Sequence, residues 1–232
     1  MTIAAVPLAE DVELSGADAL VYLDSQCTQD LSGLGGGAAA TTFVLDPAGE
    51  LVAVATARRD GGAGVVLQVP IGTGEPTAAR LRRFAIRADV TVHDPVAVLG
   101  GPPLRSELER IDAGVPSGAE LARGLVPHGV GSELMASCVS FTKGCYPGQE
   151  LVARMQARGA TPPYVLRRLL ASAPIAPGDP VGDEKFDGMV TSVAADPAGT
   201  RWHALCVLHR RDAEGATLAV RTASGTVVAQ FG

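Results

Sequence analysis

The chain is poor in cysteine, with four among its 232 residues, and no two of them form a C-x-x-C pair. Structural zinc and iron–sulfur centres usually draw their thiolates from such closely spaced pairs. We therefore expect no metal site made by this chain alone. In a reducing compartment we expect free thiols rather than disulfides at all four positions, which are Cys27, Cys138, Cys145 and Cys206.

The sequence also lacks an excess of basic residues. It has 19 Lys and Arg against 25 Asp and Glu, a formal net charge of −6. Binding to a nucleic-acid backbone needs a basic surface, so direct nucleic-acid binding is not expected. No apolar run approaches the length of a membrane span, and Glu10, Asp11 and Glu13 interrupt the N-terminal segment before it could serve as a secretory signal. These absences favour a cytoplasmic protein without a membrane partner.

What the chain does contain is 47% apolar residues, enough to bury two or three small domains that share interfaces. Its first part, residues 1–100, has the pattern of an α+β layer. Two strands flank the turn Asp46-Pro47-Ala48-Gly49, then a third strand, a helix and another strand follow. On the helix we expect Arg80, Arg82 and Arg83 to be exposed. In order, these elements are Thr42–Leu45, Glu50–Ala57, Val65–Val69, Pro76–Phe84 and Ala88–His93.

The rest of the chain divides into two further parts. Residues 101–163 begin with a predicted helix, Pro102–Gly114, and continue as a run to Gly131 whose many Gly and Pro residues leave little room for regular structure. Residues 164–232 alternate short apolar segments with turn residues, which is typical of a small antiparallel β-barrel or sandwich. The strands expected there are Tyr164–Leu170, Met189–Ala194, Trp202–Leu208, Thr217–Arg221 and Thr226–Phe231.

One stretch, residues 141–154, concentrates residues with special backbone requirements. Gly144 and Gly148, with Pro147 between them, indicate a tight turn in which the backbone can approach a ligand closely. Pro147 suits the first position of a helix because its missing N–H would have no partner there, so we expect a helix to begin at this residue. Gly159 supplies the stop signal.

Cys145 lies just before this predicted helix. The positive end of the helix dipole and the neighbouring Lys143 would both favour the thiolate over the thiol. Cys145 is therefore a candidate reactive cysteine, provided that it is exposed. The alternative is that it packs as a small buried apolar side chain in a turn. The residues alone leave both interpretations open.

The stretch resembles the signature of the YgfZ family of folate-binding proteins, within the superfamily of the glycine-cleavage T-protein, an aminomethyltransferase. Residues near the N-terminus also follow that superfamily's opening pattern, in which Asp30 is best interpreted as a turn former. The resemblance implies an α+β fold: a mixed α/β folate-binding core of two interleaved subdomains and a C-terminal β-barrel-like domain. The opening residues are Gly16, Asp18, Ala19, Tyr22, Leu23, Thr28, Asp30 and Leu31, and the signature is Lys143-Gly144-Cys145-Tyr146-Pro147-Gly148-Gln149-Glu150 with Arg154.

The resemblance further implies a ligand and a role. The ligand would be tetrahydrofolate or a one-carbon-substituted reduced folate, and the role would be support of iron–sulfur cluster assembly or repair and thereby of tRNA modification. Its partners would be iron–sulfur proteins or cluster-assembly factors. Cys145 would be the functional thiol. The residues implied in folate binding are Lys143, Gly144, Tyr146, Gly148, Gln149, Glu150 and Arg154; for Glu150 and Arg154 an i,i+4 ion pair within the helix is the alternative.

Other functions remain as alternatives. The T-protein aminomethyltransferases carry an essential aspartate that the resemblance places near Ala53 or Val54, and Leu51–Ala57 contains no acid, so that activity is disfavoured. Cys145 could serve as a nucleophile, although no Cys-His pair is visible in the sequence. The chain could also be an interaction module without a ligand. His128, near the signature, is either a pterin or phosphate contact or a surface loop histidine.

Overall fold

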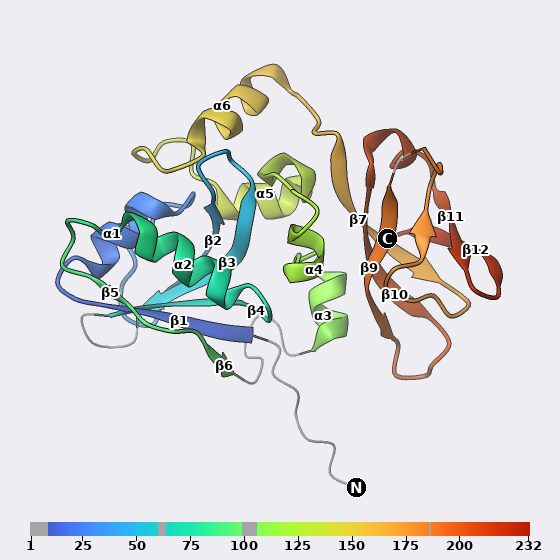
Figure 1. Cartoon of the computed structure of the whole chain (residues 1–232), viewed down its shortest axis with the longest axis horizontal. Coiled ribbons are helices and arrows are strands. Elements are labelled where there is room, and N and C mark those ends of the chain that lie inside the picture. Colours follow the sequence, from blue (N-terminus) through green and yellow to red (C-terminus); the bar gives the residue numbers. More distant parts are fainter. Residues whose placement is uncertain (1–8, 60–63, 99–105, 186) are drawn as a thin grey trace, which may run out of the picture.

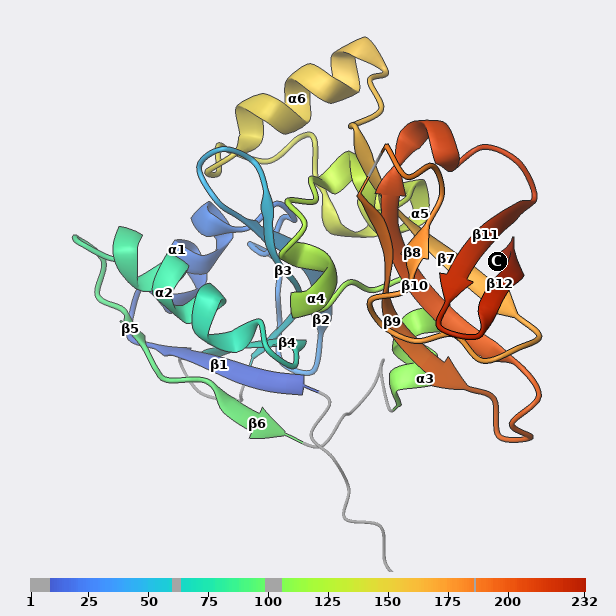
Figure 2. The ribbon, with the colours of Figure 1, turned by 45° about the vertical axis from the view of Figure 1, so that its right-hand side comes forward.

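The computed structural model describes residues 9–59, 64–98, 106–185 and 187–232. It contains two β-sheet bodies, an open sheet near the N-terminus and a closed barrel near the C-terminus, with short helices packed between them (Figure 1). The second view shows the same order, with α6 lying over the open sheet's β2–β3 hairpin and the barrel beside α3 and α4 (Figure 2). The predicted combination of an α+β core and a C-terminal β-barrel is confirmed.

The open sheet is antiparallel, with strand order β2-β3-β4-β1-β5, and β6 also pairs with β1. The Asp-Pro-Ala-Gly turn joins β2 to β3 as the sequence predicts, because Gly49 takes a positive φ of 94° that suits glycine. The expected last strand is shorter than predicted and reduces to β5. The strands are β1 (Ala9–Ser15), β2 (Ala39–Leu45), β3 (Leu51–Arg59), β4 (Val65–Pro70), β5 (Thr91–Val92) and β6 (Val96–Val98).

Two helices cover one face of this sheet, α1 (Ala19–Gln26) and α2 (Gly74–Phe84). Tyr22 of α1 ties them together by donating a hydrogen bond to the carbonyl of Leu81 at 2.5 Å. The prediction that Arg80 is exposed is wrong. Its residue is only 7% exposed, because its guanidinium turns under α2 toward the end of α1 and the β2–β3 turn.

The opposite face of β2 and β3 contributes to a second core, which also takes residues from the barrel. Phe43 and Val54 of the sheet pack there with Leu121 of α4, with Tyr146 of the loop before α6, and with Leu205 of the barrel. The helices of this layer are α3 (Glu107–Asp112), α4 (Gly118–Leu121), α5 (Ser132–Cys138) and α6 (Gln149–Arg158), with the 3₁₀ turn η1 (Pro127–Gly129).

The Gly- and Pro-rich run in the middle of the chain contains only two short elements, the four-residue helix α4 and the three-residue turn η1. The expectation of little regular structure there is confirmed. Of the helix predicted from residue 102, the structure describes the part from Ser106 onward. Ser106 caps α3 by accepting a hydrogen bond from the Glu109 amide. Its first residues, 102–105, lie outside the described residues.

The barrel closes in the order β10-β7-β12-β11-β8-β9 around its own apolar core. Three of its six strand pairings join sequence neighbours, β8–β9, β9–β10 and β11–β12, which is why the turn signals predicted it well. The two-residue strand β8 follows a proline-rich corner and has no sequence pattern of its own. The strands are β7 (Tyr164–Ala171), β8 (Pro180–Val181), β9 (Gly188–Ala195), β10 (Trp202–His209), β11 (Thr217–Thr222) and β12 (Gly225–Phe231), with η2 at Arg210–Asp212. The three-part division by residue number stays a prediction.

A buried polar network joins the helical layer to the barrel. Glu120 of α4 is fully buried and accepts hydrogen bonds from the Ser117 amide at 2.7 Å and from Ser192 Oγ of β9 at 2.6 Å. Arg110, 4% exposed, donates to Ser192 Oγ at 2.6 Å and lies 3.4 Å from Glu120. Burial opposes ionisation of Glu120, but the hydrogen bonds from Ser192 and Thr191 and the charge of Arg110 outweigh it and lower its pKa.

We predict that Glu120→Gln destabilises the protein by about 3 kcal/mol at neutral pH, because Arg110 then loses the buried one of its two carboxylate partners. The stabilisation from Glu120 is present above the ordinary glutamate pKa and is lost as pH falls through the lower pKa of the folded state. Urea unfolding of both proteins from pH 7 to pH 3 should therefore show a difference that shrinks with acid. A constant difference would contradict ionisation of Glu120.

Candidate functional site

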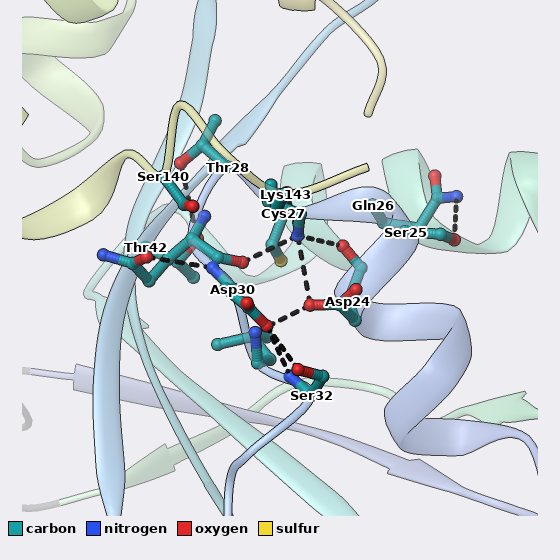
Figure 3. A network of polar contacts seen from close by, with 12 residues as sticks. Asp24, Ser25, Gln26, Cys27, Thr28, Asp30, Ser32, Thr42, Ser140 and Lys143 are labelled. Carbon is teal, nitrogen blue, oxygen red and sulfur yellow. Dashed lines mark hydrogen bonds and ion pairs between the residues drawn. The ribbon is translucent and has the colours of Figure 1, made fainter. Parts of the chain in front are cut away.

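The signature residues lie in the loop between α5 and α6, which we call the signature loop (residues 139–148), and in the first part of α6. The loop lies against the end of α1 and the turn that follows it (Figure 3) and against the hairpin turn between β2 and β3. Each of these segments contacts a different part of the loop. Its conformation is therefore fixed by tertiary contacts at both ends.

Lys143 makes the first of these contacts. Its side chain is 3% exposed, and its ammonium nitrogen lies 2.6 Å from the Asp24 carbonyl, 3.1 Å from Asp24 Oδ1, 3.1 Å from the Cys27 carbonyl and 2.7 Å from the Gln29 carbonyl (Figure 3). The Asp24 carbonyl lies in the last turn of α1 and the other two carbonyls follow that helix, at the end where the helix dipole favours a cation. We call this arrangement the Lys143 clamp. Its oxygens use all three N–H donors of the ammonium group, so the predicted contact between Lys143 and folate stays a prediction.

Thr28 extends the same connection. Its hydroxyl donates to the Cys138 carbonyl at 2.6 Å, and its carbonyl accepts from the Ser140 amide at 3.0 Å. Asp30, two residues on, accepts from both the amide and the hydroxyl of Ser32, at 2.9 and 2.6 Å. These bonds lower the pKa of Asp30 and confirm its interpretation as a turn former.

Gly148 makes the contact at the other end of the loop. It has φ +82° and caps α6 in the left-handed region. A Cβ there would lie 2.7 Å from the Asp46 carbonyl and 2.9 Å from the Gly49 Cα, so two glycines meet where the loop crosses the hairpin. Gly144 differs, since a Cβ on it would meet open space. Of the two, Gly148 serves packing and Gly144 faces outward.

The helix starts later than the sequence predicts. α6 begins at Gln149, so the expectation that Pro147 occupies the first helical position is wrong. The reason is the left-handed backbone of Gly148, which interrupts the helix between these two residues. Cys145 therefore lies four residues before α6 rather than directly before it, and the charge of Lys143 is turned toward Asp24.

Cys145 is exposed, whereas the other three cysteines are buried. Burial raises the pKa of the Cys27 and Cys138 thiols to about 12 and also raises that of Cys206. Each of these three cysteines belongs to one of the apolar cores. Cys145 is the thiol that a solvent-borne ligand or partner can reach; its greater reactivity stays a prediction.

Tyr146, next to Cys145, points into the second core and is 7% exposed. Burial raises the pKa of its hydroxyl to about 12. The alternation of a buried tyrosine with an exposed cysteine directs the thiol outward. Tyr146 thus anchors the loop in this conformation, and its predicted contact with folate is not tested.

Two charged residues of the signature lie on the surface of α6, which we call the signature helix. Glu150 and Arg154 side chains are 92% and 51% exposed, and their charged groups are 3.8 Å apart. This contact is the i,i+4 ion pair that the spacing allows, and a pair of this kind contributes only about 0.3–0.5 kcal/mol. Both groups, with the half-buried Gln149, remain accessible to a ligand.

His128 lies in η1, beside α6, and is not the surface loop histidine that one interpretation favoured. Both ring nitrogens are buried and make no hydrogen bond of normal geometry within the described residues. Burial lowers the pKa of His128, and the nearby Gln156 side chain of α6 opposes that effect in part. His128 is thus a buried polar group near the signature helix with capacity for a hydrogen-bond partner.

Sequence reasoning missed the residues that hold the loop. Asp24 and the carbonyls of Cys27 and Gln29 carry no motif, because any residue supplies a carbonyl oxygen.

The structure also shows where the two hairpin residues lie at which the resemblance placed the catalytic aspartate. Ala53 is fully buried in the first core and Val54 is 4% exposed in the second, so neither side chain faces a ligand.

Comparisons with known proteins place the fold. No protein-family model matches the chain. A protein of Haemophilus influenzae described as "Uncharacterized protein" is 26% identical over 186 residues, which cover 64% of this chain and 66%, just under two thirds, of that protein. Among solved structures, glycine cleavage system aminomethyltransferase T from Bartonella henselae matches with a TM-score of 0.66 over 96% of this chain and 82% of that chain, at 13% identity. The chain therefore has the fold of that aminomethyltransferase.

We predict that Lys143→Met destabilises the protein by about 1–3 kcal/mol, because the Asp24 carboxylate and three carbonyls lose a charged donor. The released loop should also change the rate at which Cys145 reacts with iodoacetamide. Urea unfolding and mass-spectrometric labelling would measure both. Lys185→Met, at an exposed position, is the matched control; if the two variants behave alike, the clamp does not hold the loop.

Proposed function

We propose that the protein is a folate-binding accessory protein of the YgfZ type, in which Cys145 is the functional thiol. The observation that carries the proposal is the single exposed cysteine, held on a clamped loop within the fold of an aminomethyltransferase T. A thiol that is kept accessible while three others are buried suits a role in chemistry or partner contact rather than packing.

The residues around the loop fit a reduced folate. A pterin is flat and rich in hydrogen-bonding groups, and a folate's glutamate is anionic. Gly144 leaves open space beside the thiol, Gln149 offers an amide, and Arg154 offers an exposed guanidinium with only a long contact to Glu150. The unpartnered ring of His128 lies beside the same helix. Tetrahydrofolate or a one-carbon-substituted form would bind here, with Lys143, Tyr146 and Gly148 shaping the loop from within.

The proposed role is to support iron–sulfur cluster assembly or repair in the cytoplasm, and through it the enzymes that modify tRNA. The partners would be iron–sulfur proteins or assembly factors that reach Cys145. Within the described residues, no helix has both the length and the apolar character needed to cross a membrane. Folate-dependent aminomethyl transfer, the second candidate, is less well supported because Ala53 and Val54 are buried aliphatic residues where it needs a carboxylate.

Reduced folates should raise the melting temperature of the purified protein. A ligand at about 100 times its Kd contributes roughly 2.7 kcal/mol of stability. Arg154→Ala should weaken folate binding by about 1.5–3 kcal/mol while changing the stability of the free protein by no more than about 0.5 kcal/mol. Arg158→Ala, exposed on the same helix, is the control. If no reduced folate stabilises the wild-type protein, the folate proposal is wrong.

Cys145→Ser should leave unfolding nearly unchanged, because the side chain is exposed and of similar size, and should abolish support of iron–sulfur enzymes in cells. The measurement is complementation of a host that lacks its own copy, with Thr142→Ser as the control at a neighbouring exposed position. Full complementation by Cys145→Ser would mean that the thiol has no functional role.

A further inference from the structure

Arg80 of α2 is a buried cation whose hydrogen-bond acceptors are all neutral. Its Nε donates to the Leu45 carbonyl at 2.8 Å and its Nη1 donates to Gln26 Oε1 at 2.9 Å. Its Nη2 is buried and has no acceptor within the described part of the chain. Burial is the main influence on this group and lowers the pKa of Arg80, although Tyr22, Cys27 and Asp46 partly offset it. A charged donor left unpartnered in the interior is unfavourable and needs an explanation.

The other buried cations in the described residues differ from Arg80 in this respect. The Lys143 ammonium lies 3.1 Å from Asp24, and the Arg110 guanidinium lies 2.5 Å from Glu107 and 3.4 Å from Glu120. Burial of charge is tolerated when an opposite charge accompanies it. No described carboxylate lies within 4 Å of Arg80, and Asp46 acts on it only from farther away, so Arg80 has no direct ion pair in the described residues.

The surroundings of Arg80 are cationic and apolar. The Phe84 ring covers the guanidinium, with its centroid 4.4 Å from the Arg80 Cζ and 5.9 Å from the Arg83 Cζ. Phe84 is 38% exposed and Ile86 is 84% exposed. Arg83 and Arg87 are exposed and form no ion pair within the described residues. Arg80 and Arg83 of α2 and Arg87 just beyond it thus have no ion pair in the described residues, and the exposed Phe84 and Ile86 lie among them in the sequence.

We propose that the C-terminal end of α2 binds an organic carboxylate that carries an apolar body. The carboxylate would accept hydrogen bonds from Arg80 Nη2 and from Arg83, and the apolar body would contact Phe84 and Ile86. Planar guanidinium groups suit this task because they pair with carboxylates through two parallel hydrogen bonds. Phe84 covers Arg80 from the solvent side and turns aside on binding, a motion available to an exposed side chain.

The test uses the full chain and pairs of matched probes. The first probe is 4-fluorophenylacetate, observed by fluorine NMR, against the neutral 4-fluorophenylacetamide. The second is the peptide N-acetyl-Leu-Glu-Leu-amide against its Gln counterpart. We expect a carboxylate probe to bind with a Kd of about 1 mM or lower, as small ligands do. We expect its neutral counterpart to bind about tenfold more weakly or worse, because it lacks the charge-assisted hydrogen bonds.

Two variants make the result specific to this site. Arg80→Met should abolish binding, and because it also removes two hydrogen bonds within the protein, Arg83→Glu serves as the second variant at an exposed position. Arg83→Glu should weaken carboxylate binding at least tenfold and leave unfolding unchanged, while Arg158→Glu on α6 should leave both unchanged.

The outcomes separate the sources of the ligand. Preference for the small probe supports a free carboxylate metabolite, and preference for the peptide supports an acidic segment of a partner protein. If neither carboxylate binds more tightly than its neutral counterpart, or if Arg83→Glu and Arg158→Glu have equal effects, the proposal is overturned and Arg80 serves only to hold α1 and the hairpin. The result is independent of whether folate binds near Cys145.

Discussion

The conformation of the candidate site depends on one buried ammonium group. Four oxygens from the last turn of α1 and the segment after it surround Lys143 within 3.1 Å, and three of them are backbone carbonyls. A lysine suits this cage because its charge is compact and its three donors can point in different directions, whereas a planar guanidinium could not fit. The desolvation cost of burying this charge is offset only while Asp24 and the carbonyls keep their places. The clamp therefore couples the signature loop to the first helix of the sheet.

The rest of the loop follows from this constraint. With Lys143 turned inward and Tyr146 packed into the second core, the residues between them, Gly144 and Cys145, face solvent. Gly148 then crosses Gly49 so closely that neither position has room for a Cβ. These contacts join three segments that are distant in sequence. An exposed thiol held in this way keeps one orientation without being covered, which is the property that a thiol acting on a ligand or partner requires.

Features with a local physical cause could be predicted from the sequence. The Asp46-Pro47-Ala48-Gly49 turn, the strands around it and the meander of the barrel all follow from alternation and turn chemistry. The spacing of Glu150 and Arg154 allowed the ion pair that the structure has, whereas the sequence left the exposure of Cys145 open. A contact to a backbone carbonyl leaves no pattern in the sequence, so the sequence could not predict the Lys143 clamp. The same reason explains Arg80, whose helical position indicated exposure while its acceptors, Leu45 and Gln26, lie on other elements.

The three buried cations Lys143, Arg110 and Arg80 differ in how their charges are paired. Lys143 and Arg110 each close a network in which every described donor meets an acceptor and a carboxylate balances the charge. Removing a partner from such a network is costly, so these residues are fixed by stability. Arg80 departs from that rule within the described residues, because its Nη2 has neither acceptor nor counter-charge. An unpaired buried donor in a native structure calls for an explanation, and for Arg80 we propose a ligand that supplies the missing acceptor.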